Sequence, residues 1–182
     1  MIIAEKDIIE LKLNRLIGKP INVDLRKLKT IGSSSFHLKK FINKTDKSES
    51  LKIDSKCNFE IFEKGLLFRS NYSNKLNAIP IPKNELIKIN LIKGKELINP
   101  FPLSPMWILL KLGVSILYAR YFQIWWFNEY KIDEMTLMIK TKDYEMSMIT
   151  NSYIFERQQK FFESLNLNDK IMIDKTPVAN NS

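Results

Sequence analysis

CNFEIFEKGLLFRS, residues 57–70, is the stretch that decides the fold class. Apolar side chains occupy every second position from Cys57 to Ile61, which predicts a strand with one buried face. The tripeptide at 63–65 predicts a turn, because its glycine can adopt a positive φ. The returning strand is expected over 66–70. An antiparallel hairpin is therefore the starting element of the fold.

More strands and one closing helix are expected downstream. Alternating apolar residues predict strands at 75–81 and 87–91, and a second hairpin formed by 135–141 and 144–149. Asn151 or Ser152 then begins an amphipathic helix that extends to Leu165. The apolar side of this helix is expected to consist of Ile154, Gln158, Phe161, Phe162 and Leu165.

The part before residue 51 is expected to be an extension of the main domain. A helix is predicted over 5–17 and a strand over 21–26, and a polar stretch at 43–50 (NKTDKSES) has the composition of a linker. The chain is therefore divided into a helix/strand extension with linker at 1–50, a main domain at 51–170 and a tail at 171–182. The main domain carries a hydrophobic helical insertion at 104–122.

The main domain resembles the pleckstrin-homology-like superfamily, most closely its bacterial PH-like and GRAM-like domains. The similarity lies in the opening run at 57–70, in AIPIPKNELIKINLI at 78–92, in the hairpin at 135–149 and in the helix at 152–165. It implies an α+β fold, with a bent antiparallel sheet or partly open barrel closed by the C-terminal helix. The helical insertion and the N-terminal extension are additions to that fold.

The resemblance also implies a binding module for membranes or proteins rather than an enzyme. The best-known members carry a basic lipid-binding signature around their first hairpin. Lys64, Arg69 and Lys75 are the basic residues nearest that place here. Their spacing does not match the signature, so phosphoinositide binding does not follow from the resemblance.

The insertion is the most apolar part of the chain. Ser104-Pro105 predicts a helix start, and the residues from Met106 to Ala119 are interrupted only by Lys111 and Ser115. YFQIWWF follows at 121–127 and is the aromatic-richest window of the sequence.

Three structures for the insertion are compatible with the sequence. It can form a transmembrane helix, a helix lying in a membrane interface, or a helix buried against the sheet or a partner chain, with 121–127 entering the next strand. We favour burial with a contribution to a protein interface. The residues expected to contact a partner or a membrane are Leu109, Lys111, Leu112, Tyr118, Tyr121, Trp125 and Trp126.

Groups with catalytic chemistry are few. His37 is the single histidine and is expected in a loop, and Cys57 is expected to be a buried apolar residue. Glu129, Asp133 and Glu134 form the densest acidic group, which predicts a solvated connection between strands, with cation binding or acid–base chemistry as the alternatives. We therefore predict no catalytic residues, no metal site and no cofactor.

The formal net charge of +9 leaves more than one function open. Only 5 of the 29 basic residues are arginine, and the excess of lysine is typical of an AT-rich coding sequence. The first ten residues lack the apolar run of a signal peptide, so a cytoplasmic protein is expected, with peripheral membrane attachment left open. We predict a non-catalytic adaptor for a protein partner, a second copy of the chain or an anionic membrane. The alternatives are charge-driven nucleic-acid binding and, after that, an enzyme.

Overall fold

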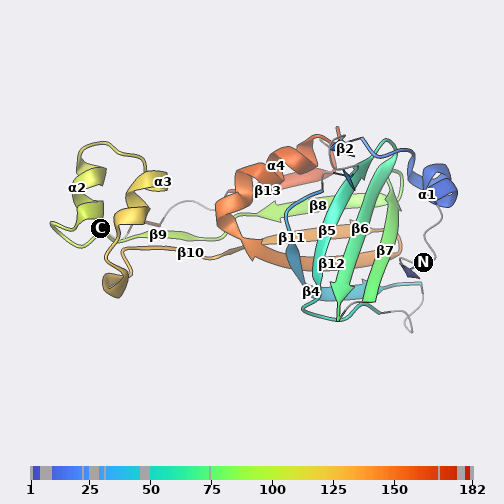
Figure 1. The fold of residues 1–182 in the computed structure, drawn as a ribbon, viewed down its shortest axis with the longest axis horizontal. Coiled ribbons are helices and arrows are strands. Elements are labelled where there is room, and N and C mark those ends of the chain that lie inside the picture. Colours follow the sequence, from blue (N-terminus) through green and yellow to red (C-terminus); the bar gives the residue numbers. More distant parts are fainter. Residues whose placement is uncertain are drawn as a thin grey trace.

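The computed structural model describes residues 2–4, 10–21, 23–24, 29–30, 32–45, 50–73, 75–167, 169–175 and 179–180. It has an α+β fold, with a large and mostly antiparallel sheet, a few helices, and an arm that ends in a small helical lobe (Figure 1). The sheet with its covering helices is called the body below. The lobe, residues 99–129, lies at the opposite end of the molecule from helix α1 (Glu10–Ile17).

The main sheet has nine strands in the order β1-β7-β6-β5-β4-β12-β11-β8-β13. Neighbouring strands are antiparallel, except that β13 runs parallel to β8. Among the described residues the end strands β1 and β13 do not pair with each other, so the sheet is not a closed barrel. The strands are β1 (Ile3–Ala4), β4 (Phe36–Asn43), β5 (Lys56–Phe62), β6 (Gly65–Tyr72), β7 (Lys75–Pro82), β8 (Leu86–Ile92), β11 (Glu134–Thr141), β12 (Tyr144–Asn151) and β13 (Ile171–Asp174).

Strand β4 joins the two halves of this sheet. It pairs with β5 only near its start, at Phe36 and His37, and with β12 along most of its length. The register with β12 shifts between Ser147 and Met148, and such a bulge bends the strands. Because β4 comes from the segment expected to be an extension, the sheet uses residues on both sides of the boundary predicted at residue 50.

The core lies between the bent sheet and the C-terminal helix α4 (Phe155–Glu163). Phe162 is fully buried and its ring meets Phe59 of β5 edge-on, with ring centroids 5.8 Å apart. At the other end of the body, helix α1 (Glu10–Ile17) packs Leu13 and Ile17 into a smaller apolar cluster. A two-stranded ribbon of β2 (Val23–Asp24) and β3 (Lys29–Thr30) completes the body.

The predicted elements of the body are largely present, with two differences in detail. The predicted helix over 5–17 is seen as α1, and residues 5–9 lie outside the described part of the chain. The closing helix begins with a 3₁₀ turn, η4 (Ser152–Ile154), which winds more tightly than an α-helix. That turn rotates the buried face, so that Phe155 is buried while Phe161, expected in the core, is only half-buried.

We expect Phe162→Ala to lower the free energy of unfolding by about 3–5 kcal/mol, because it leaves a cavity beneath α4. Phe161→Ala is the matched control and should cost clearly less, since that ring is half-buried. Urea denaturation followed by circular dichroism measures both values. Equal losses for the two variants would contradict the packing described for α4.

Candidate functional site

A short arm carries the lobe away from the sheet. Strand β8 continues into β9 (Glu96–Ile98), and β10 (Tyr130–Ile132) leads back into β11, so the arm extends the β8–β11 pair. A third strand, β14 (Ala179–Asn180), lies parallel to β9. The stretch expected to be a tail, 171–182, thus supplies β13 to the main sheet and β14 to the arm.

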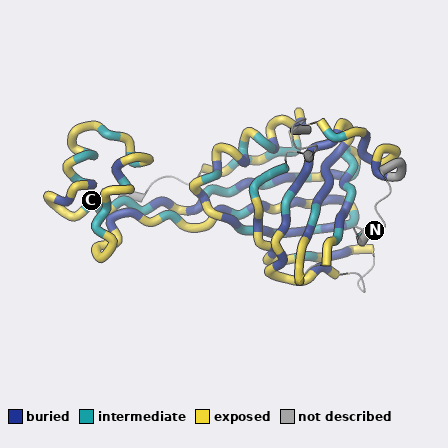
Figure 2. The backbone as a smooth tube through the Cα atoms, in the orientation of Figure 1, coloured by how far each residue is buried: buried dark blue, intermediate teal, exposed yellow. Residues whose placement is uncertain are grey.

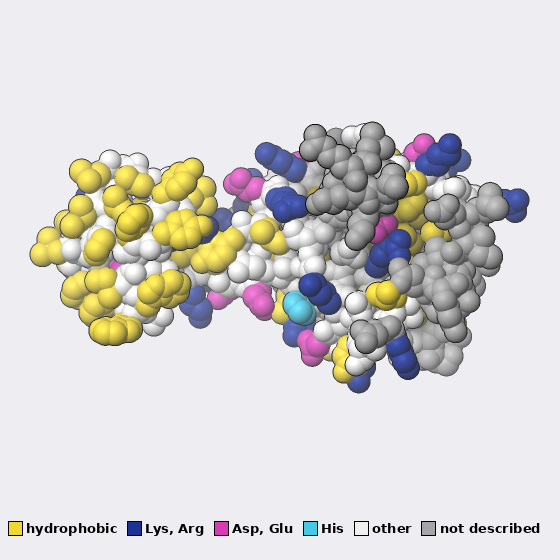
Figure 3. Space-filling view, viewed as in Figure 1, with side chains coloured by type: hydrophobic (Ala, Val, Ile, Leu, Met, Phe, Trp, Pro, Cys, Tyr) yellow, Lys and Arg dark blue, Asp and Glu magenta, His cyan; other side chains and the backbone are white. Residues whose placement is uncertain are grey.

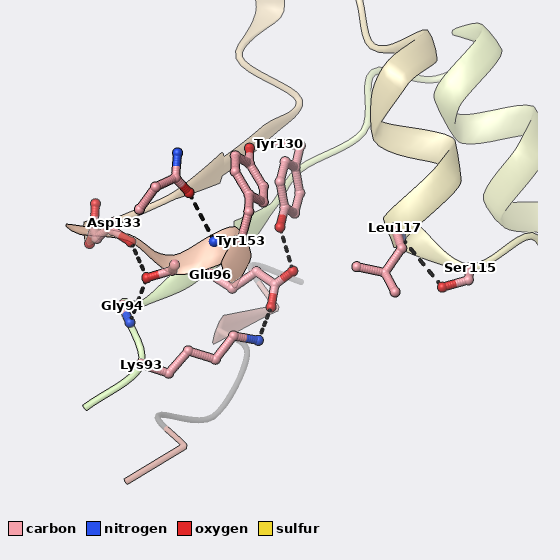
Figure 4. Close-up of polar contacts among 10 residues, drawn as sticks. Lys93, Gly94, Glu96, Ser115, Leu117, Tyr130, Asp133 and Tyr153 are labelled. Carbon is pink, nitrogen blue, oxygen red and sulfur yellow. Dashed lines mark hydrogen bonds and ion pairs between the residues drawn. The ribbon is translucent and has the colours of Figure 1, made fainter. Parts of the chain in front are cut away.

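The arm leaves the body at a very close backbone crossing. A Cβ atom on Gly94 would lie 2.0 Å from the carbonyl oxygen of Asp133, so only glycine fits there. The buried hydroxyl of Ser152 donates to that same carbonyl at 2.6 Å and accepts from the Gly94 N–H at 3.0 Å (Figure 4). The first residue of η4 therefore fastens both strands of the arm.

A polar and aromatic cluster supports the base of the lobe. Buried Glu96 accepts from the Tyr130 hydroxyl at 2.7 Å and from Lys93 Nζ at 3.0 Å (Figure 4). Burial, together with the bond to Glu96, raises the pKa of the Tyr130 hydroxyl, so this group remains a donor. The Arg120 guanidinium lies 3.9 Å from the ring centre of Tyr153, which ties the lobe to η4 by a cation–π contact.

The lobe consists of four short helical elements around a small core. They are α2 (Pro105–Lys111), α3 (Ile116–Ala119), η2 (Arg120–Phe122) and η3 (Trp125–Phe127). The core contains Met106, Ala119 and Tyr130. The helix expected in the insertion at 104–122 is not continuous, because Gly113, with a φ of 81°, breaks it. Two 3₁₀ turns lie within 120–127, where 121–127 was expected to enter a strand.

Glu129 is the polar centre of the lobe. Its side chain is 0% exposed, although the sequence predicted a solvated connection there. One carboxylate oxygen accepts from the Phe101 N–H at 2.8 Å and from the Ser104 hydroxyl, and the other accepts from the Ile124 N–H. Since Ser104 also caps α2 by accepting from the Trp107 N–H, one carboxylate fixes three separate segments.

Most of the apolar side chains of the lobe point to solvent. Exposure reaches 92% at Trp126, and Figures 2 and 3 show an exposed, hydrophobic surface over the lobe. Leu103 is 77% exposed and has a φ of 66°, an uncommon conformation for leucine. The exposed large side chains are Phe101, Leu103, Ile108, Leu112, Leu117, Tyr118, Tyr121, Phe122, Trp125, Trp126 and Phe127. We call these eleven residues the apolar lobe surface.

The expectation that the insertion is buried against the sheet is therefore wrong. The hairpin continues through the arm and holds the insertion away from the sheet, whose core is already covered by α4 (Figure 1). Leu109 is half-buried in the lobe's own core. The other residues predicted to contact a partner or membrane are all exposed on the lobe: Lys111, Leu112, Tyr118, Tyr121, Trp125 and Trp126.

The predicted basic patch is not brought together. Lys64 lies in the turn before β6. Lys75 begins β7, which follows the opposite end of β6. Strand β6 has eight residues, so the two lysines are separated by about 25 Å. Arg69 lies between them and is paired with Glu60 at 2.8 Å.

Other predicted chemistry is dispersed. His37 lies exposed on strand β4 rather than in a loop, and Cys57 is buried on β5 with its thiol 3.5 Å from the Phe36 carbonyl. Within the described ranges, no three His, Cys, Asp or Glu side chains gather as metal ligands. None of the helices in that part of the chain has the length and hydrophobicity required to cross a membrane.

Sequence reasoning did not predict the contacts that hold the lobe together. The contacts that order this region join residues about thirty positions apart in the sequence. They are the bonds of Glu129 with Phe101 and of Glu96 with Tyr130, and the contact of Arg120 with Tyr153. The one local signal was Ser104-Pro105, a helix start that the structure confirms.

Comparison with family models, with curated proteins and with solved structures found no match for this chain.

We expect Glu129→Ala to loosen the lobe while leaving the body folded. The substitution removes the acceptor of two N–H groups and one hydroxyl, and a hydrogen bond to a charged group contributes about 1.5–3 kcal/mol. Limited proteolysis should then cut within 99–129 at least ten times faster, at an unchanged melting temperature of the body. Exposed Glu134→Ala is the control, and an uncut lobe in Glu129→Ala would contradict the role of this carboxylate.

We expect the Cys57 thiol to be inert in the native protein. Burial raises its pKa to about 12, so the reactive thiolate is a fraction on the order of 10⁻⁴ at pH 8. Titration with a chromogenic disulfide reagent should find no free thiol at pH 8 before denaturation and one afterwards. Rapid native labelling would contradict the burial of Cys57.

Proposed function

We propose that the protein is a non-catalytic binding module that docks through its arm-borne lobe. The body serves as a scaffold, and the apolar lobe surface is the docking element. One observation carries this proposal: eleven large hydrophobic side chains are exposed on one small lobe. Contiguous apolar surface of this kind is uncommon on a monomer and is typical of an interaction site.

The body does not need this surface for its own folding. Its core is composed of side chains from the sheet and from α4, and the lobe has a separate small core around Met106. The lobe side chains therefore remain available to a second molecule. The close crossing at Gly94 and the hydrogen bonds of Glu129 already hold the arm and the lobe in place. Docking would therefore cost little conformational entropy in the lobe, which favours binding.

The strand order supports a relationship to PH-like binding modules. The run β7-β6-β5-β4-β12-β11-β8 is antiparallel throughout and is followed by one helix after the last hairpin, and we propose that it corresponds to the bent sheet of a PH-like domain. In this proposal the lobe is an insertion between two strands of a PH-like sheet. Its arm places the docking element at one end of the domain.

Charge-driven nucleic-acid binding receives less support from the structure. On the face shown in Figure 3, the Lys and Arg side chains of the body are scattered, with Asp and Glu between them. A nucleic-acid site requires basic residues clustered along a face or stripe. The lobe itself presents hydrophobic rather than basic residues on that face.

All three tryptophans lie in the lobe, so intrinsic fluorescence tests the accessibility of the docking element directly. We expect water-like emission that is readily quenched by acrylamide, and binding of the dye ANS to the apolar lobe surface. Leu112→Ser with Trp126→Ser should abolish most dye binding and shift stability by at most about 0.5 kcal/mol, because both side chains are exposed.

Ile53→Ser is the matched control, since Ile53 is an exposed hydrophobic residue of the body. It should leave dye binding unchanged. Blue-shifted emission that resists quenching, together with no dye binding, would show that the lobe is covered within the protein and would reject a docking function.

A further inference from the structure

We propose that the occupant of the apolar lobe surface is an anionic lipid bilayer, into whose interface the lobe inserts. This inference rests on the docking function proposed above and names its partner. It commits to a membrane rather than to a protein or a second copy of the chain. Three features of the lobe carry it: its shape, its aromatic content and its charge.

The shape of the lobe fits a deformable partner. Exposed hydrophobic side chains come from α2, α3, η2, η3 and the loop before α2, so every helical element of the lobe contributes to the apolar lobe surface. A protein–protein interface has an apolar centre with a polar rim, formed on one side of each partner. A bilayer instead surrounds a protruding lobe from all sides and needs no complementary pocket.

The aromatic residues are of the kind that prefers a membrane–water boundary. Two tryptophans and two tyrosines are exposed on the lobe. Trp and Tyr combine an apolar ring with a polar tip, and they concentrate at the level of the lipid headgroups. The aliphatic members of the surface, such as Leu112 and Leu117, are suited to the acyl chains just beneath.

The charge of the lobe fits an anionic surface. No acidic residue occurs between Glu96 and Glu129, and both of these glutamates are buried with hydrogen-bonding partners. The charged residues within that interval are Lys111 and Arg120. Lys111 is exposed with Nζ 5.5 Å from the ring centre of Trp107, so its stem can lie on apolar surface while the ammonium reaches lipid phosphates.

Insertion does not require a helix that spans the bilayer. Interfacial elements bury their apolar face about 5–10 Å into the headgroup and acyl boundary, which is comparable to the roughly 10 Å length of the seven-residue α2. The arm holds the lobe clear of the body, so the body need not enter the lipid (Figure 1).

The test is binding to vesicles of phosphatidylcholine alone and to vesicles with 30% phosphatidylglycerol, at about 0.1 M salt. We expect a blue shift of tryptophan emission and co-sedimentation with the anionic vesicles. Lys111→Gln should weaken anionic-vesicle binding about fivefold, and Leu112→Asp at least about tenfold. Lys142→Gln, exposed in the β11–β12 turn at the far end of β11 from the arm, should change it less than twofold.

Several outcomes would overturn the membrane proposal. These are no fluorescence response to either vesicle, equal binding of wild type and Leu112→Asp, or binding insensitive to lipid charge and to Lys111→Gln. Sedimentation equilibrium without lipid covers a further case: a dimer that Leu112→Asp dissociates would identify a second copy as the occupant. If ANS binds the lobe but vesicles do not, the docking function survives and the lipid partner is rejected.

Discussion

The close crossing of Gly94 and Asp133 is the constraint on which the overall arrangement depends. Because Gly94 has no side chain, the two strands can pass close to each other. The hydroxyl of Ser152 can then form hydrogen bonds with both strands. The β8–β11 pair thereby continues into the arm instead of opening into a loop. An apolar segment of the size of the lobe, inserted in an unpaired loop, would be free to collapse onto the sheet. Because the apolar segment is carried on an arm of paired strands, it is held away from the sheet.

A buried carboxylate then stabilises a lobe that has little hydrophobic core. Glu129 can only accept hydrogen bonds, and it faces two backbone N–H groups and the Ser104 hydroxyl, which can only reach it if their segments converge. Polar bonds of this kind fix geometry without consuming apolar surface. The lobe can for that reason be ordered and still leave most of its large hydrophobic side chains outside.

The sequence predicted the elements whose pairing is local. The two hairpins at 57–70 and 135–149 and the closing helix have periodic apolar faces and short connections, and each is present. Strand β4 was missed as part of the sheet because its main partner, β12, lies about a hundred residues away in the chain. The insertion was misplaced because an apolar run has the same composition whether it is buried or presented to a partner. Glu129 was misread since nothing in its neighbouring residues indicates three converging donors.

The lobe has a hydrophobic core of its own, separate from the core of the body. A hydrophobic surface that closed the body would lie over the sheet, and that place is occupied by α4 with Phe155 and Phe162. The cation–π contact of Arg120 with Tyr153 connects the lobe to the body at the base of the lobe, and the Tyr130–Glu96 hydrogen bond joins the two strands of the arm. The exposed side chains of η3 and of the α2–α3 turn are not part of the body's core, so removing them should leave that core intact. Burying these side chains against a second molecule would contribute their free energy of transfer from water to binding, and in our proposal that molecule is the lipid bilayer.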